Sequence, residues 1–471
     1  MPVYKKGDKN SCENYRPISL LCIVSKVLER ALFNNIYQNL LKKISAYQHG
    51  FLRGRSTVTQ LLTVLDDLSK TLDASGQSDV IYLDFSKAFD SVSHRLLIHK
   101  LKKFGITGPL LKWFSSYLSG RTQRVVIEGS SSPWLPVISG VPQGSILGPM
   151  LFLLYIDDIT ECISDGSSIY LFADDAKVYR PINSIFDCIL LQADLSSLEK
   201  WSEVWKLNFN ASKCKIMSVC RTFVHKYLYH LNGIILDRVS EFNDLGIIVS
   251  SDLSFNSHIR NKIAKGSQIL GMIKRATGYN APIKVKKMFY TSLVRSSIMY
   301  GSVIWSINKS DMVLLESLQR RATKYILKDY SSSYLARLSR LDLLPLNYCK
   351  DFCDLCFFYK CLHKFYDMEI DKIVSIYDVS SSMTRMGQRG ILLSQRAART
   401  EKRFCFFSHR IVPLWNQLPD AARSIISPNK NIVPFKSTLS DYFKNKTITV
   451  FDTNNICTWS LCCRCPNCRP M

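Results

Sequence analysis

The chain has 471 residues, 46% of them hydrophobic, and a formal net charge of +24. This length and apolar content suffice to bury one large core or several smaller ones, which excludes a disordered or low-complexity protein. The most apolar run, residues 146–156, is too short to span a membrane, and no secretory signal follows Met1. We therefore expect a protein that is neither membrane-inserted nor secreted.

The positive charge is unevenly distributed. Residues 257–411 contain 27 Lys and Arg against 11 Asp and Glu. Such an excess favours a polyanionic partner, because neutralised phosphates release counterions, although a solvated basic surface would have the same composition.

The first 215 residues alternate between helical and strand-like patterns. The predicted elements are a helix over 23–41, a strand over 80–84, a helix over 110–118 and a buried helix over 146–155. This alternation predicts an α/β or α+β domain.

A second, α-rich and basic region is predicted from about residue 259. Helices are expected over 259–276 and 312–327. Residues 376–400 are rich in Ser, Arg and Gly, which predicts a linker or a mobile arm.

Three aspartates form the candidate catalytic group. Asp84 directly follows an apolar strand, and Asp174 and Asp175 lie between two short apolar runs that predict a hairpin with the two acids at its tip. Carboxylates from two strands could hold two Mg²⁺ ions, one lowering the pKa of an attacking hydroxyl and one stabilising a departing pyrophosphate. Each Asp alone is more often a turn or capping residue.

A glycine-rich loop, Ser139 to Pro149, separates these strands. Its glycines allow the backbone to approach a nucleotide closely, and Gln143 is available to hydrogen-bond it, although the segment could be an ordinary loop. A second acid pair, Asp157 and Asp158, follows the predicted buried helix. We interpret these two as helix-end residues.

Several motifs, in order, resemble those of non-LTR (LINE-type, jockey-like) reverse transcriptases. Those resembling the polymerase motifs A, B and C are Asp84-Phe-Ser-Lys-Ala-Phe-Asp, Gly140-Val-Pro-Gln-Gly-Ser and Phe172-Ala-Asp-Asp. The first finger motif is resembled by Lys5-Lys-Gly-Asp followed by Asn14-Tyr-Arg-Pro-Ile-Ser-Leu, and the second by Gln48-His-Gly-Phe-Leu-Arg-Gly-Arg-Ser. Trp201 to Lys213 resembles motif D, and Phe242-Asn-Asp-Leu-Gly-Ile resembles the primer grip. Tyr300-Gly-Ser-Val-Ile-Trp and Leu414-Trp-Asn-Gln-Leu-Pro resemble the carboxy-terminal segments of jockey-like elements.

The resemblance implies an α+β right-hand polymerase with fingers, a palm built on an antiparallel sheet and a helical thumb, followed by an α-rich basic C-terminal region. The expected division is fingers over 1–80, palm over 81–240, primer grip and thumb over 241–330, the C-terminal region over 331–446 and a Cys-rich tail over 447–471.

It also implies an activity, RNA-directed DNA synthesis, and roles for named residues. Asp84, Asp174 and Asp175, with the backbone carbonyl of Phe85, would bind two Mg²⁺ ions, for which Mn²⁺ could substitute. Lys213 would protonate the leaving pyrophosphate.

Other residues would bind the substrates, which are template RNA, primer DNA and dNTPs. Phe89 would exclude a ribose 2′-hydroxyl, and Gln143 and Gly144 would contact the incoming nucleotide. Arg16 and Lys26 would bind the triphosphate, and Arg53 and Arg55 the template. The competing interpretation is a core position for Phe89 and plain solvation for the basic residues.

The sixteen cysteines are scattered, which predicts reduced thiols in a cytosolic or nuclear protein. Five lie among the last fifteen residues, and Cys465 and Cys468 have the spacing of Zn²⁺ ligands. A frayed, reduced tail is the favoured interpretation of this segment. Cys353 and Cys356 share the spacing but lie in a helix-like stretch, and they are predicted to be residues of the hydrophobic core.

Alternative functions are a group II intron-type maturase, a decayed RNA-binding remnant without catalysis and, last, a structural or chromatin protein. The chain opens inside the first finger motif, so we expect it to be a fragment of a longer reading frame, with an endonuclease upstream. We expect a ribonucleoprotein of the nucleus and cytoplasm.

Overall fold

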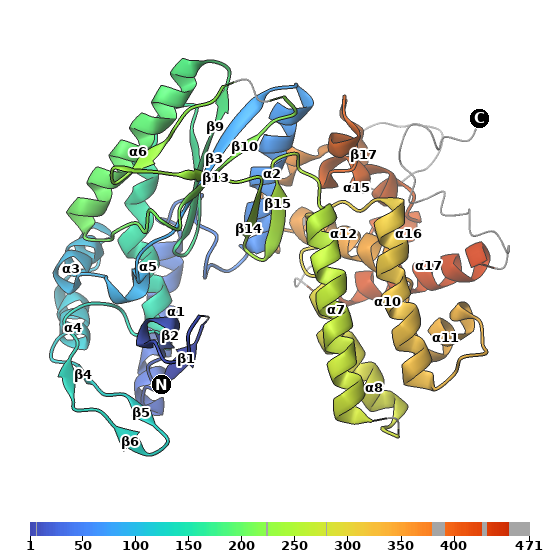
Figure 1. Cartoon of the computed structure of the whole chain (residues 1–471), viewed down its shortest axis with the longest axis horizontal. Coiled ribbons are helices and arrows are strands. Elements are labelled where there is room, and N and C mark those ends of the chain that lie inside the picture. Colours follow the sequence, from blue (N-terminus) through green and yellow to red (C-terminus); the bar gives the residue numbers. More distant parts are fainter. Residues whose placement is uncertain (6, 223–224, 279, 379–390, 426–430, 452–471) are drawn as a thin grey trace. The chain divides into compact units, whose positions relative to one another are not determined.

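The computed structural model describes residues 1–5, 7–222, 225–278, 280–378, 391–425 and 431–451 (Figure 1). The chain forms two compact units. The first unit consists of Met1–Ser56, Gln77–Ser218 and Phe223–Val239, and the second of Thr57–Gly76, Val219–Thr222 and Ser240–Met471.

The first unit is built on a five-stranded sheet of order β13-β10-β3-β9-β8. The strands are β3 (Gln77–Leu83), β8 (Ser168–Phe172), β9 (Asp175–Ile182), β10 (Lys215–Val219) and β13 (Asp237–Arg238). Strands β3 and β8 are both antiparallel to β9. Every residue of β3 is buried, as expected for a central strand covered on both faces.

Helices pack around this sheet. Helix α5 (Leu147–Ile156) has nine buried residues, which explains its uniformly apolar sequence. Helix α6 (Ile185–Trp205) packs on β9 and begins at a capping box in which Ser184 and Asp187 satisfy each other's backbone amides. The other helices of this unit are α1 (Ile23–Leu41), α3 (His94–Lys103) and α4 (Gly108–Leu118).

Short strand pairs complete the first unit. They are β1 (Pro2–Tyr4) with β2 (Tyr15–Pro17), β4 (Thr122–Gln123) with β7 (Leu135–Pro136), β5 (Val126–Ile127) with β6 (Ser130–Ser131), and β11 (His230–Leu231) with β12 (Ile234–Ile235).

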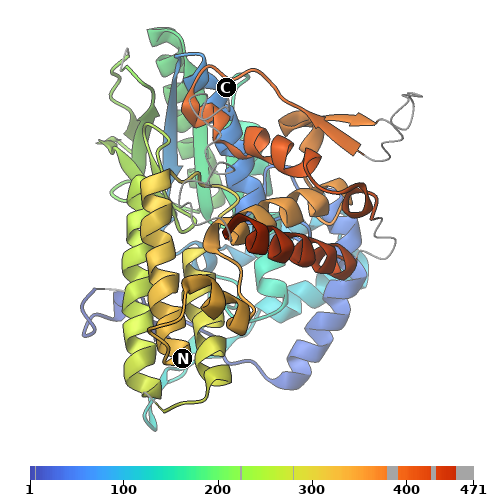
Figure 2. The same ribbon diagram turned by 90° about the vertical axis from the view of Figure 1, so that its right-hand side faces the viewer.

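The second unit is mostly helical. Helices α7 (Asn256–Thr277) and α10 (Lys309–Leu327) lie side by side, as Figures 1 and 2 both show. Further elements of this unit are β14 (Glu241–Asp244), β15 (Ile247–Ser250), α8 (Ile283–Phe289), a π-helical turn (Tyr290–Arg295), α9 (Ser296–Ile298), α11 (Tyr334–Leu341), α12 (Leu346–Leu362), α13 (Ile370–Ile373), α14 (Glu401–Phe404), α15 (Phe407–Asn416), α16 (Asp420–Arg423) and α17 (Val433–Phe451).

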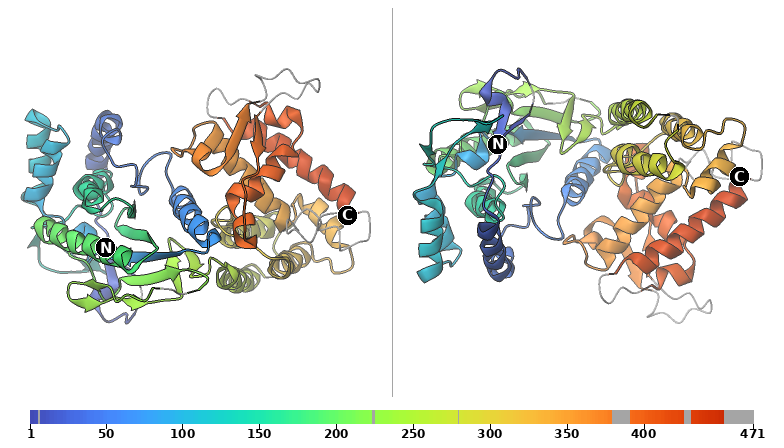
Figure 3. Two further views of the ribbon diagram at one scale, coloured as in Figure 1. Left: turned by 90° about the horizontal axis from the view of Figure 1, so that it is seen from above. Right: turned by 90° about the horizontal axis from the view of Figure 1, so that it is seen from below.

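Helix α2 (Thr57–Asp73) belongs to this second unit although its sequence neighbours belong to the first. It packs against α14, and both views of Figure 3 show α2 beside the C-terminal helices. The contact includes a buried ion pair in which Arg403 donates to Asp66 at 2.7 Å. The carboxylate of Asp73 also accepts from the backbone amides of Arg399 and Thr400, the two residues that precede α14.

The predicted helices and the central strand are confirmed with small shifts at their ends, and the α-rich region after residue 259 is confirmed as well. The linker predicted over 376–400 is wrong for its described parts. Strands β16 (Ser375–Asp378) and β17 (Ile391–Ser394) pair antiparallel, and Asn416 exchanges two hydrogen bonds with the backbone of Leu393. Both strands are short, and the polar composition of the segment between them led to the prediction of a linker.

Among the described helices, none combines the length and the apolar character needed to cross a membrane. Cys353 and Cys356 lie in α12, with Cys356 buried, as predicted. The proposed Zn²⁺ ligands Cys465 and Cys468 lie outside the described residues.

Candidate active site

The sheet register brings the motif A and motif C aspartates together. Leu83, the last residue of β3, pairs with Ala176, and Phe172 pairs with Asp175 across the β8–β9 hairpin. Ala173 and Asp174 therefore form the two-residue turn, and Asp84 follows the strand that ends beside it. The predicted hairpin with its acids at the tip is confirmed.

The charge of Asp84 affects the ionisation of Asp174. Burial raises the pKa of Asp174 and the negative charge of Asp84 raises it further, while the positive charges of Arg16 and Lys5 lower it. Asp175, in contrast, is exposed. The turn thus places one half-buried and one exposed carboxylate next to each other.

The backbone of Asp84 and Phe85 is held by residues 208–210. The amide of Asn210 donates to the Asp84 carbonyl at 2.7 Å, and the ring of Phe85 stacks on Phe209 with centroids 4.6 Å apart. This pairing places Lys213 beside the site, where its Nζ lies 3.5 Å from Oδ2 of Asp84. The same Oδ2 atom is buried and has no hydrogen-bond partner among the described residues.

The acids supply the hard oxygen donors that Mg²⁺ prefers. No group of three or more Asp, Glu, His or Cys side chains within the described ranges is arranged to hold a metal ion. However, burial and the charge of Asp84 raise the pKa of Asp174, and Oδ2 of Asp84 accepts no hydrogen bond from a described residue, so a divalent cation would offset the negative charge gathered here. Asp84 and Asp174 therefore fit a divalent ion by chemistry and charge.

The glycine-rich loop packs directly on motif A. Gly140 has φ +87°, and a Cβ there would lie 2.9 Å from the Cα and carbonyl oxygen of Asp90. Gly144 has φ +113°, and its Cβ would lie 2.8 Å from the carbonyl oxygen of Ser19. Both positions require glycine because the backbone conformation and the available space each disfavour a side chain. Gly144 is itself exposed, whereas Gln143 is half-buried and donates to Asp90.

Phe89 is half-buried on the short turn that follows motif A. Its ring stacks on Phe152 of α5 with centroids 4.3 Å apart, and the edge of Phe51 meets it at 6.2 Å. The ring is therefore fixed from two sides while part of it stays accessible.

The predicted basic residues have different surroundings. Arg16 is exposed on β2 and acts on Asp174 through its charge, whereas Lys26 is half-buried near the start of α1. The guanidinium of Arg53 lies 5.3 Å from the ring centroid of Tyr37. The guanidinium of Arg55 donates to the carbonyl oxygens of Ser45 and Gln48 at 2.8 and 2.7 Å, so it closes its own loop.

The sequence-based assignment missed Gln48, Lys5 and Glu29. The carboxylate of buried Glu29 accepts from the first amides of α5, Ile146 and Leu147, at 2.7 and 3.2 Å. Lys5 and Gln48 stand inside the two finger motifs, which was the available signal. Glu29 lies in a helical pattern in which a glutamate is usually a solvated surface residue, so its position in the sequence did not indicate a buried role.

Asp157 and Asp158 are confirmed as helix-end residues, because they follow α5 and begin a 3₁₀ turn. Asp157 accepts from the amide of Ser45, and burial raises its pKa to about 6. Asp158 accepts from the indole of Trp201 at 2.7 Å and pairs with buried Lys100. Both acids have structural partners away from motifs A and C.

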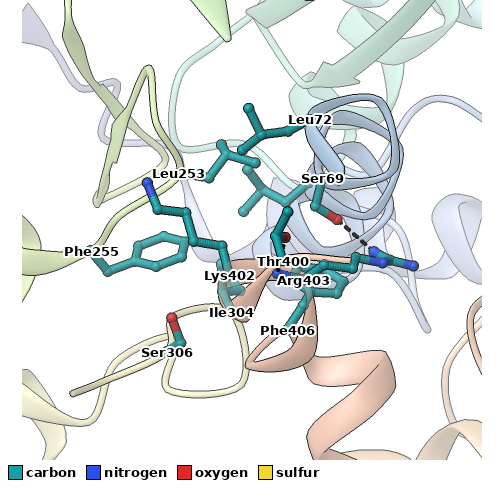
Figure 4. Close-up of a pocket in the computed structure, with 11 residues that line it drawn as sticks. Ser69, Leu72, Leu253, Phe255, Ile304, Ser306, Thr400, Lys402, Arg403 and Phe406 are labelled. Carbon is teal, nitrogen blue, oxygen red and sulfur yellow. Dashed lines mark hydrogen bonds between the residues drawn. The ribbon is translucent and has the colours of Figure 1, made fainter. Parts of the chain in front are cut away.

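A small cavity lies wholly in the second unit, between α2 and α14 (Figure 4). Its volume is about 20 Å³, enough for a single water molecule and far too small for a nucleotide. Figure 4 shows Arg403 and Ser69 at its edge, joined by a hydrogen bond of 2.5 Å. The cavity is therefore a packing feature of the α2 contact.

Comparison with known families gives one match across residues 3–249, to the model described as reverse transcriptase (RNA-dependent DNA polymerase). Among curated proteins, the chain is 28% identical over 342 residues to the RNA-directed DNA polymerase from mobile element jockey of Drosophila melanogaster. It is 30% identical over 346 residues to the probable RNA-directed DNA polymerase from transposon BS of the same organism. Each alignment covers 69% of this chain and 37% of the relative, so the chain spans little more than a third of the length of these relatives.

Among solved structures, the chain is similar to apo telomerase from Candida tropicalis, with a TM-score of 0.40 and 10% sequence identity. That alignment covers 67% of this chain and 53% of the telomerase chain.

Proposed function

The chain belongs to the reverse transcriptase (RNA-dependent DNA polymerase) family, on its non-LTR retrotransposon side, and from this premise we propose that it copies an RNA template into DNA from a primer. Its substrates would be template RNA, primer DNA and dNTPs, and it would work as a ribonucleoprotein of the nucleus and cytoplasm. The single observation that supports the proposal is the strand register, in which Asp84 follows the end of β3 beside the turn that contains Asp174.

Each residue would have a distinct part in the reaction. Asp84 and Asp174, with Asp175 and the carbonyl of Phe85, would hold Mg²⁺ or Mn²⁺, which when bound lowers the pKa of the primer hydroxyl and stabilises the pyrophosphate. Lys213, beside Asp84, would give a proton to the departing pyrophosphate.

The remaining residues would position and select the nucleotide. The accessible part of the Phe89 ring would exclude a ribose 2′-hydroxyl, and Gln143 and Gly144 would lie against the incoming nucleotide. Arg16, whose positive charge lowers the pKa of Asp174, would bind the triphosphate together with Lys26. Arg53 would contact the template, with Arg55 supporting the same loop.

Primer extension on a primed RNA, with dNTPs and Mg²⁺, tests the proposal. The wild-type chain should extend the primer and lose this activity in EDTA. Asp84→Asn should abolish extension, while Asp237→Asn, the same substitution at an exposed site on the same sheet, should leave it intact. Wild-type protein that binds the primed RNA without extending it in Mg²⁺ or Mn²⁺ would contradict the proposal and favour an RNA-binding remnant.

A further inference from the structure

A short segment of the second finger motif is joined to the edge of the catalytic sheet. The amide of His49 donates to the carbonyl of Leu171 at 2.8 Å, and the amide of Leu171 donates to the carbonyl of Tyr47 at 3.0 Å. Gln48 thereby forms a parallel bridge with Leu171 on β8. The segment runs directly toward the turn that carries Asp174.

The Gln48 side chain reaches that turn. It is fully buried, and its Oε1 accepts two hydrogen bonds, from the amide of Gly50 at 2.8 Å and from the amide of Ala173 at 2.9 Å. Ala173 immediately precedes Asp174. One side-chain oxygen therefore ties the finger motif to the backbone of the catalytic turn.

The turn needs such support because Ala173 has φ +57°. A positive φ at the first residue of a two-residue hairpin turn favours glycine, and an alanine there is strained. Strained residues persist only where the surrounding structure holds them in place. The hydrogen bond from Ala173 to Gln48 supplies a restraint on the strained residue itself.

Two neighbours of Gln48 strengthen the restraint. A Cβ on Gly50 would lie 2.3 Å from the amide nitrogen of Ala173, so only glycine allows the two segments to approach this closely. The guanidinium of Arg55 donates to the carbonyl oxygens of Ser45 and Gln48, which fixes the loop from the other side. The arrangement runs from Arg55 through Gln48 to Ala173.

We propose that Gln48 is a positioning residue that holds Ala173, and through it the Asp174 carboxylate, in the conformation needed to bind the catalytic metal. This inference rests on the proposed function and deepens it. Gln48 acts through the turn and is not placed against substrate. Arg55 would support the same turn indirectly, because its guanidinium donates to the backbone carbonyl of Gln48.

The experiment compares Gln48→Met, which removes the acceptor at similar volume, with Gln48→Glu, which keeps an acceptor oxygen at the same reach. Gln60→Met is the matched control, because Gln60 is also fully buried but lies in α2 of the second unit. Three quantities are measured on the full chain. They are the thermal midpoint, hydrogen exchange of the peptide covering 170–176, and the Mg²⁺ concentration that gives half-maximal primer extension.

In Gln48→Met we expect faster exchange at 170–176 and a loss of about 10- to 100-fold in metal affinity or rate, as for other residues that orient metal ligands. Gln48→Glu should restore both quantities toward wild type, and Gln60→Met should change neither. Gly50→Ala should perturb the same peptide by displacing Ala173, and it serves as the second variant if Gln48→Met does not fold.

Wild-type exchange and Mg²⁺ dependence in a folded Gln48→Met, or in Gly50→Ala if that variant replaces it, would overturn the inference. A loss in Gln60→Met as large as that in Gln48→Met would also overturn it, because removal of a buried amide elsewhere would then have the same effect. If the wild-type chain itself does not extend a primer, the proposed function fails instead, and the exchange of 170–176 still decides whether Gln48 restrains the turn.

Discussion

Gln143 donates a hydrogen bond of 2.9 Å from its Nε2 to Oδ1 of Asp90, which joins the glycine-rich loop to the last residue of motif A. Burial raises the pKa of Asp90, and this hydrogen bond opposes the rise. The side-chain amide of Gln143 is thereby oriented by an anionic partner, and the loop position depends on the charge of Asp90.

Gln143→Glu should reduce primer extension in a pH-dependent manner. Two carboxyl groups at this distance cannot both ionise without repulsion, so the pKa of one must rise. Extension relative to wild type should be lowest at high pH and should recover as the pH falls and one carboxyl takes up a proton. Gln143→Met, which has no titratable group, should show a loss that does not vary between pH 6 and 8.5, and parallel profiles for both variants would contradict this account.

Phe89→Val should admit ribonucleotides, because a smaller side chain leaves room for a 2′-hydroxyl. The stacking of Phe89 on Phe152 predicts some loss of stability as well, below the roughly 3–5 kcal/mol of a fully buried Phe→Ala change. The ratio of dNTP to rNTP incorporation is the measurement. Phe186→Ala, at an exposed site on α6, is the control and should keep wild-type discrimination.

Asp174→Asn should lower extension by at least about three orders of magnitude, each tenfold loss being about 1.4 kcal/mol of barrier. Affinity for a primed RNA should change little and remain steeply salt-dependent, because that term comes from Lys and Arg. Filter binding and extension on one preparation separate the two effects. Near-normal extension would move the metal site elsewhere.

The same variant makes a second, opposite prediction for stability. The raised pKa of Asp174 means that its protonated form stabilises the fold at low pH, and this stability is lost as the pH rises through the raised pKa. Asp174→Asn cannot ionise, so in EDTA at neutral pH it should unfold at higher urea concentration than wild type. A lower urea midpoint for Asp174→Asn than for wild type would show that the Asp174 charge does not destabilise the metal-free fold.

Arg403→Met should destabilise the second unit by about 3 kcal/mol, because it leaves the buried carboxylate of Asp66 without its guanidinium partner. Lys70, which also pairs with Asp66, should moderate the loss. The double variant Asp66→Leu/Arg403→Met should recover much of it in urea unfolding. Arg340→Met breaks an ion pair in which Arg340 is half-exposed and should have little effect.

Regular periodicity and local motifs were sufficient to predict the helices, the central strand and the turn bearing Asp174. The helix over 23–41 coincides with α1 at both ends because its apolar spacing is local information. The contact of Gln48 with Ala173 spans 125 positions, and that of Arg403 with Asp66 spans 337. No sequence pattern near either residue of these pairs indicates which distant residue it contacts, so the two contacts can be identified only in the folded structure.

Helix α2 has a consequence for how such proteins can be recombined. The chain crosses between its two units at 56/57, 76/77, 218/219, 222/223 and 239/240, so neither unit is one continuous stretch of coding sequence. A gene cut near residue 240 would separate the buried leucines Leu61, Leu62, Leu65 and Leu68 of α2 from the C-terminal helices of their own unit. A chimera that exchanges the C-terminal part between relatives must therefore also transfer the distant segment 57–76, and the two segments are expected to vary together.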